Sequence, residues 1–209
     1  MRKNIFILIL LFIYILIQKD IIINILLNKN KKRVCVINLM NSQNVGNILV
    51  KFSLFKKLKE LGFNTTIVTS MGYPNVNISF LNRTTNFLLI KNVFSELNEN
   101  DYDYIVVNSD QTWRNYDKKY FYDIAFLYFA RNWKIPKFIY GTSIGSDYWA
   151  FKKEDDEIAK KLLKNFKGIS FREKGLISLA EKHLKIKGEF VLDPTLLIDK
   201  KYYLNEIQN

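Results

Sequence analysis

From Arg33 onward, the chain alternates short runs of apolar residues with longer amphipathic stretches. The short runs are apolar on both faces, which is typical of strands in a parallel sheet covered on both sides. They predict strands at Val34–Leu39, Thr65–Thr69, Tyr104–Asn108, Lys137–Gly141, Gly168–Phe171 and Glu189–Leu192, with a further strand at Phe87–Ile90. The stretches between them predict helices at Asn47–Leu61, Ile124–Asn132, Glu154–Phe166 and Glu173–Leu184. Gly62 and Gly168 stand where C-terminal helix caps are expected. The alternation predicts an α/β fold with an open, mostly parallel, Rossmann-like sheet.

The N-terminal segment has a different pattern, because Ile5–Ile17 is an unbroken apolar run and the apolar character resumes at Ile21–Leu27. As one helix, residues 5–27 would span about 34 Å, enough for the hydrocarbon core of a bilayer. Lys19 and Asp20 oppose this reading, since each costs about 3 kcal/mol near the bilayer centre. They lie toward one end of the run, where snorkelling reduces that cost. The pattern favours a hydrophobic helix that acts as a single-pass membrane anchor.

Two other readings of this segment stay open, a cleaved signal peptide and a non-membrane extension. A signal peptide needs small residues at its cleavage site, and residues 1–33 contain no Ala, Gly or Ser. Basic residues flank the apolar run on both sides: Arg2 and Lys3 before it, and Lys29, Lys31, Lys32 and Arg33 after it. The slight excess on the C-terminal side favours a cytoplasmic location for the domain that follows.

Composition excludes several classes of protein. The chain has 209 residues, of which 48% are hydrophobic and 25% charged, so it is an ordinary globular domain and not a disordered chain. Cys35 and His183 are the only residues of their types, which excludes zinc modules and disulfide frameworks, and no metal site is expected. The net charge is +12, but the basic residues are scattered and only 6 of the 32 are arginine. Nucleic-acid binding is therefore not expected.

Polar residues follow five of the predicted strands. Because the carboxyl ends of parallel strands share one edge of a sheet, and ligands of such sheets bind there, these residues predict a site. The segments are 41–47 (NSQNVGN), 109–113 (SDQTW), 142–145 (TSIG), Arg172-Glu173 and Asp193-Pro194-Thr195.

Each segment also has a purely structural interpretation. Asn44-x-Gly46-Asn47 is either a turn with a helix cap or an anion cradle at a helix N-terminus. Ser109-Asp110-Gln111 either caps a helix above a packed Trp113 or binds a sugar or a base. Arg172 either pairs with a carboxylate or holds an anion bidentately. Asp193-Pro194 reads as a rigid turn, and His183, late in a helix beside two lysines, as an exposed side chain.

The blocks NVGNILVKFSLFKKLKELG, VVNSDQTW, YGTSIG, ISFRE and VLDPTLLI, in this order between Val34 and Ile198, resemble the polysaccharide pyruvyl transferase family. The resemblance implies an enzyme that moves the carbon skeleton of phosphoenolpyruvate, as a pyruvate ketal, onto sugar hydroxyls of a cell-surface glycan. The implied acceptor is the glycan or a lipid-linked sugar. It implies a fold similar to that of two-domain GT-B glycosyltransferases, with the active site between two Rossmann-like halves. Phosphoenolpyruvate is a substrate, and no cofactor is implied.

By position, the resemblance assigns substrate-binding residues but no catalytic residue. Arg172 matches the family's S-x-R-[ED] arginine, for which it implies anion binding. The other matching positions are Asn44, Gly46, Asn47, Ser109, Asp110, Gln111, Ser143 and Gly145. The sequence departs from the family pattern at Asn108, where glycine is usual, and at Val45, where tyrosine is common.

The expected organisation is a membrane-anchor segment over residues 1–32, a Rossmann-like N-terminal domain over 33–198, and the start of an interdomain crossover over 199–209. The family's second domain, with its histidine, is absent from these residues, and a separate chain is one possible source of it. Two alternatives stay open beside the pyruvyl transferase: a GT-B glycosyltransferase that uses a sugar nucleotide, and a catalytically inactive fragment.

Overall fold

The computed structural model describes residues 31–38, 45–70, 87–90, 96–108, 111–114 and 118–207. Within them, seven parallel strands form one open sheet in the order β3-β2-β1-β4-β5-β6-β7. The strands are β1 (Arg33–Ile37), β2 (Asn64–Ser70), β3 (Phe87–Ile90), β4 (Tyr104–Asn108), β5 (Lys137–Thr142), β6 (Phe166–Phe171) and β7 (Glu189–Phe190). The predicted open parallel α/β sheet is confirmed.

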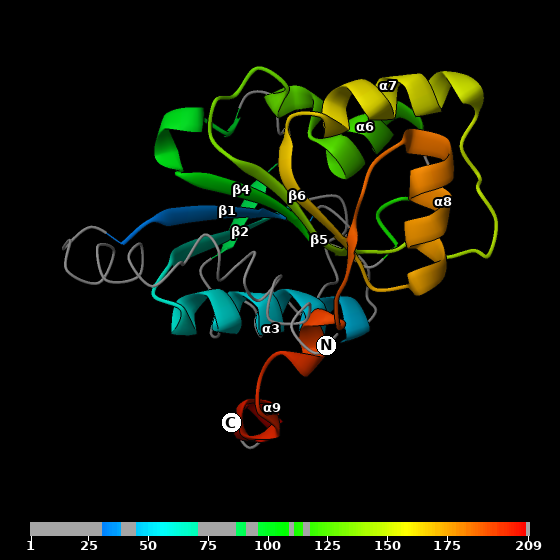
Figure 1. Cartoon of the computed structure of the whole chain (residues 1–209). Coiled ribbons are helices and arrows are strands. Elements are labelled where there is room, and N and C mark those ends of the chain that lie inside the picture. The colour runs from blue at the N-terminus through cyan, green and yellow to red at the C-terminus, as the bar shows by residue number, and fades with distance from the viewer. Residues whose placement is uncertain are drawn as a thin grey trace, which may run out of the picture.

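Helices cover both faces of this sheet (Figure 1). The helices are α3 (Val45–Glu60), α6 (Lys118–Phe126), α7 (Lys153–Leu163), α8 (Lys174–Leu184) and α9 (Lys200–Ile207), with 3₁₀ turns η1 (Glu99–Asp101), η2 (Tyr128–Ala130) and η3 (Pro194–Leu196). Helix α3 lies on one face, and α6, α7 and α8 pack on the other. Helix α9 follows η3 below α3.

The two sides of the core follow the alternation of side chains along β1. Val34 and Val36 point to the α3 side, where they pack with Leu54 and Phe55 of that helix. Cys35 and Ile37 point to the opposite side, which also contains the fully buried Trp113. Apolar residues on both faces are what a doubly covered parallel strand requires.

The chain reverses its direction of travel across the sheet at the border between β1 and β4. From β1 it proceeds through α3 to β2 and β3 on one side, and β4 then starts the other half. In open α/β sheets, ligands bind in the crevice outside the carboxyl ends of the strands at such a switch point. The topology therefore identifies the edge where a site is expected.

Some of the predicted elements need correction. The helix predicted at Ile124–Asn132 is wrong in its bounds: α6 ends at Phe126, and Leu127 takes a left-handed φ of 52° before η2. Gly168 is not a helix cap but lies inside β6, because α7 already ends at Leu163. Gly62 does follow α3 with a φ of 90°, and its N–H donates to the Lys59 carbonyl, as a C-terminal cap requires.

In the part of the chain that the structure describes, no helix is both long and apolar enough to cross a membrane. The hydrophobic helix predicted over residues 5–27 lies outside the described residues, so the anchor stays a prediction.

Candidate functional site

The structure brings the described members of the predicted site to one edge of the sheet. Gly46 and Asn47 lie in the first turn of α3, which follows β1. Gln111 follows β4, and Arg172 comes directly after β6. Ser143 and Gly145 follow β5. Asn44, Ser109 and Asp110 lie outside the described residues.

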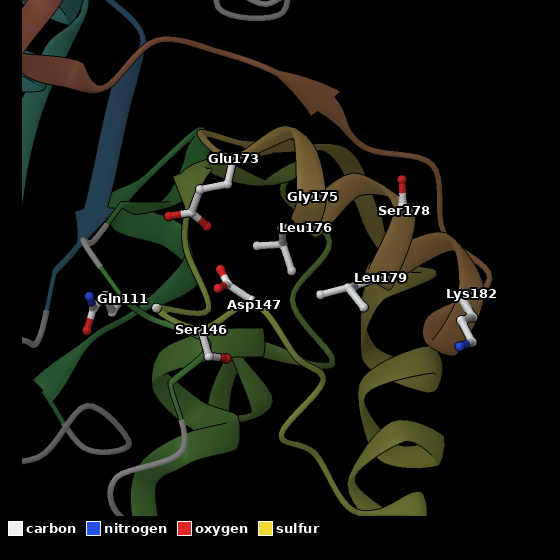
Figure 2. Close-up of a pocket in the computed structure, with 10 residues that line it drawn as sticks. Gln111, Ser146, Asp147, Glu173, Gly175, Leu176, Ser178, Leu179 and Lys182 are labelled. Atoms are coloured by element: carbon white, nitrogen blue, oxygen red, sulfur yellow. The ribbon is translucent and has the colours of Figure 1, made fainter.

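A pocket of about 730 Å³ opens at this edge, between the loop after β5 and helix α8 (Figure 2). Its lining residues are Gln111, Gly145, Ser146, Asp147, Glu173, Gly175, Leu176, Ser178, Leu179 and Lys182. Figure 2 shows the carboxylate of Glu173, at the start of α8, and that of Asp147, in the facing loop, pointing toward one another, with Leu176 beside them. The volume falls within the range of small-ligand pockets.

Hydrogen bonds hold the two loops of this pocket together. The Ser143 hydroxyl donates to Glu173 Oε1 at 2.5 Å and accepts from the Gly145 N–H at 3.0 Å. Gly145 has a φ of 68°, and a Cβ there would lie 2.6 Å from Cδ of Gln111. The left-handed backbone conformation therefore favours glycine at this position, and the missing Cβ leaves room for the end of the Gln111 side chain.

Arg172 lies between two carboxylates. Its Nη1 donates to Asp193 Oδ2 at 2.7 Å, and its Nε is 3.7 Å from Glu173 Oε1. Burial disfavours ionisation of Asp193, but hydrogen bonds from Thr195 and Arg172 outweigh it and lower the pKa of that carboxyl. Asp193 also caps η3 by accepting from the Thr195 N–H. The structural pairing of Arg172 is thus confirmed, while its role in anion binding stays a prediction.

Trp113 is packed in the hydrophobic core, as the packing interpretation of SDQTW expects. Its indole is fully buried, with ring centroids 5.2 Å from Phe171 and 5.4 Å from Phe126. Its backbone N–H donates to the Ser143 carbonyl at 3.0 Å. Trp113 therefore couples the loop after β4 to the loop after β5.

Several residues of the pocket were not predicted. Asp147 lies four positions beyond Ser143, so it could have been found by reading further along the loop after β5. Gly175, Leu179 and Lys182 follow each other at helical spacing, so they share one face of α8. That face could have been found once the start of the helix was placed after Arg172.

His183 is not the exposed side chain that the sequence predicts, since its ring stacks on Trp149 with the ring centroids 4.8 Å apart.

The described residues contain no group of three or more His, Cys, Asp or Glu side chains that could hold a metal ion. What they do present at the carboxyl edge is a set of hydroxyl, amide, carboxylate and cationic groups. This set is suited to a ligand that carries hydroxyls and anionic groups.

An α/β domain with a polar pocket at the carboxyl edge of its parallel sheet has the architecture of doubly wound domains, which bind their ligands at that edge. The model of the polysaccharide pyruvyl transferase family matches residues 44–208, a range that includes all the described helices from α3 to α9. The chain belongs to that family. No curated protein matches the chain.

Proposed function

We propose that this domain takes part in transferring the pyruvate group of phosphoenolpyruvate to sugar hydroxyls of a cell-surface glycan. The observation that carries the proposal is a pocket at the carboxyl edge, lined by Gln111 and Gly145, in a chain of the polysaccharide pyruvyl transferase family. The proposal includes a GT-B-like second domain, in the same or a separate chain, and membrane association through Ile5–Leu27.

The pocket has the chemistry of a sugar site. Asp147 and Glu173 supply carboxylate oxygens that accept hydrogen bonds from hydroxyls, and Gln111 both donates and accepts. Leu176 and Leu179 add an apolar surface on which the C–H groups of a sugar ring can rest. Two carboxylates beside one lysine, Lys182, make the pocket a poor site for a phosphate. We assign it to the acceptor.

The reaction also needs proton transfers and an anion site. Ketal formation joins C2 of phosphoenolpyruvate to two sugar oxygens and breaks the bond from C2 to the phosphate oxygen. Both sugar hydroxyls lose their protons, and in the overall balance one proton goes to the enol carbon and one to the released phosphate, so the site needs a base and an acid. Asp147 faces the acceptor pocket and is the candidate for that base. The donor's phosphate and carboxylate require cationic groups, for which Arg172 is the first candidate.

The donor can be tested by calorimetry with the full chain. We expect phosphoenolpyruvate to bind and a UDP-sugar to compete weakly or not at all. Binding of the UDP-sugar without binding of phosphoenolpyruvate would instead favour the glycosyltransferase alternative.

The same calorimetry tests the role of Arg172. Arg172→Ala is expected to weaken phosphoenolpyruvate binding by about 1.5–3 kcal/mol, the usual loss for a hydrogen bond to a charged group. The matched control is Arg131→Ala, because Arg131 stacks on Tyr128 near η2 and lines no part of the pocket. If Arg172 serves only to pair with Asp193, its variant will lose stability and still bind phosphoenolpyruvate with unchanged affinity.

Filling the pocket tests the acceptor assignment. Leu179→Trp places a large side chain in the pocket, and it should weaken the binding of a neutral oligosaccharide acceptor at least tenfold without changing phosphoenolpyruvate affinity. Glu181→Trp puts the same side chain on an exposed position of α8 outside the pocket lining and serves as the control. Saturation-transfer NMR measures the acceptor. Equal acceptor binding by both variants would show that the acceptor lies elsewhere.

A further inference from the structure

The face of α3 that packs on the sheet changes from apolar to polar along its length. Leu54 and Leu58 pack against the strands, and one turn toward the N-terminus the same stripe continues with Lys51 and Asn47. Both polar side chains are buried, Lys51 with only 2% of its surface exposed. Since α3 begins beside the carboxyl end of β1, its polar part overlies the strand ends and its apolar part overlies the strands.

A row of polar side chains lies beneath Lys51 on the same face of the sheet. Val36 pairs with Ile67 and with Val106, and all three belong to the core on the α3 side. Two positions later, on the same face, these three strands present Asn38, Thr69 and Asn108. All three are buried, and the Asn38 N–H donates to the Val68 carbonyl, so the ladder continues to this level. The row crosses the border between β1 and β4, where the switch point lies.

Some of these buried groups have no hydrogen-bond partner. Within the described structure, neither polar atom of the Asn38 side chain is bonded, nor is Oδ1 of Asn108. Lys51 Nζ donates to the Thr69 hydroxyl at 3.1 Å. Buried polar groups in native proteins are almost always satisfied, so orphaned atoms indicate a water, an ion or a ligand that completes the site.

The charges at this point favour an anion as that ligand. Burial lowers the pKa of Lys51 to about 8, so the side chain is still mainly an ammonium at neutral pH. The unbonded Asn38 amide adds N–H donors, and the N-terminus of the 16-residue helix α3 directs its positive end to the same edge. Ammonium, amide N–H groups and a helix N-terminus together are the donors that bind phosphate or carboxylate oxygens.

We propose that Lys51 and Asn38 form an oxyanion site at the switch point between β1 and β4. The site binds a phosphate or a carboxylate group. The assignment of this group to the phosphoenolpyruvate donor rests on the proposed function. The binding of an oxyanion at this site does not.

Sulfate is the probe, because its charge is constant between pH 7 and 9. Its affinity is measured from the shift in thermal midpoint of the full chain, with ionic strength held constant by chloride. We expect Lys51→Met to weaken sulfate binding at least tenfold at pH 7. Lys59→Met removes an exposed lysine from the last turn of the same helix and should leave the affinity within twofold of wild type.

The pH dependence gives a second readout. With a pKa of about 8, Lys51 is about 90% protonated at pH 7 and about 10% at pH 9, so sulfate affinity of the wild type should fall roughly tenfold over this range. Three described tyrosines and Asp193 on this side of the sheet keep their charge between pH 7 and 9. The pKa values of Tyr104, Tyr140 and Tyr203 are raised above that of a free phenol, and the pKa of Asp193 is lowered. The Lys51→Met variant should show no such fall.

Asn38→Asp tests the site with a second variant, so the result does not depend on whether Lys51→Met folds. It has the same shape and adds a negative charge beside Lys51, so it should abolish sulfate binding while the protein remains folded. Equal sulfate affinity in wild type and Lys51→Met, or a wild-type affinity independent of pH, would overturn the oxyanion site. If sulfate binds through Lys51 but phosphoenolpyruvate does not displace it, the site stands and its assignment to the donor falls.

Discussion

Replacing Trp113 with alanine is expected to lower the free energy of unfolding by about 3–5 kcal/mol, the usual cost of removing a fully buried tryptophan. The indole is at the centre of an aromatic cluster, with ring centroids 5.2 Å from Phe171, 6.0 Å from Phe151 and 6.3 Å from Trp149. These rings come from β6 and from the loop before α7, so the cavity left by alanine cannot be closed by moving one element.

Urea denaturation monitored by circular dichroism measures this loss. Trp133→Ala is the matched control, because Trp133 is only partly buried and its ring contacts Phe129 outside the Trp113 cluster. It should cost clearly less than Trp113→Ala. Comparable losses for the two variants would show that the aromatic cluster is not the stabilising centre assigned here.

In Trp113→Ala, the pocket should also lose its shape under conditions in which the protein is still folded. The Trp113 backbone N–H donates to the Ser143 carbonyl, and the Ser143 hydroxyl in turn bonds Glu173 and Gly145. The variant keeps this backbone hydrogen bond, but without the indole the loop after β4 loses the packing against Phe171 and Phe126 that fixes its position beside the loop after β5. Acceptor binding should therefore fall even at temperatures where the variant is still folded.

The strands could be predicted because their sequence signal is local. A strand buried on both faces is a short apolar run, and Tyr104–Asn108 and Phe87–Ile90 were predicted with the observed bounds. The end of α6 could not be predicted in this way. Residues 124–130 (IAFLYFA) are apolar without a helical period, so the sequence does not show that the helix ends at Phe126. The left-handed Leu127 that follows the helix is not a residue type that signals a break.

Site residues that directly follow a strand could be predicted from the sequence, whereas site residues within a helix could not. Parallel strands bring their carboxyl ends to one edge, so Gln111, Ser143 and Gly145 could be placed together from the order of the elements alone. Lys51 could not, because burial of one lysine among 32 basic residues leaves no mark in the sequence. It becomes visible only when the stripe of α3 is seen to turn polar above Asn38.

Lys51→Met is expected to change both the free energy of unfolding and its dependence on pH. Burial lowers the pKa of Lys51 from 10.5 to about 8, and each unit corresponds to about 1.4 kcal/mol. Keeping this ammonium in the folded protein therefore costs about 3 kcal/mol. Lys51→Met removes that cost and loses the interactions of the ammonium, among them the hydrogen bond to Thr69, and a hydrogen bond is worth about 1 kcal/mol. The variant is expected to be more stable than wild type at pH 7 by about 1–2 kcal/mol.

The sign of the pH dependence follows from the lowered pKa. Below pH 8 the folded and unfolded states are both protonated at Lys51, and the full cost is present. Between pH 8 and 10.5 the unfolded state binds more protons than the folded state, so wild-type stability gains relative to the variant as the pH rises. Denaturation at pH 7 and pH 10 should show the advantage of Lys51→Met disappearing, while Lys59→Met stays within about 0.5 kcal/mol of wild type.

A lysine that destabilises the fold is retained for a function, and added sulfate tests whether that function is anion binding. Sulfate binds the folded wild type and so raises its stability, whereas Lys51→Met gains little from it. The advantage of the variant at pH 7 should therefore shrink as sulfate is added at constant ionic strength. A variant that is less stable than wild type at pH 7, with or without sulfate, would mean that Lys51 supports the fold itself. A variant that is more stable in buffer but not in sulfate would identify the buried charge as a cost of ligand binding.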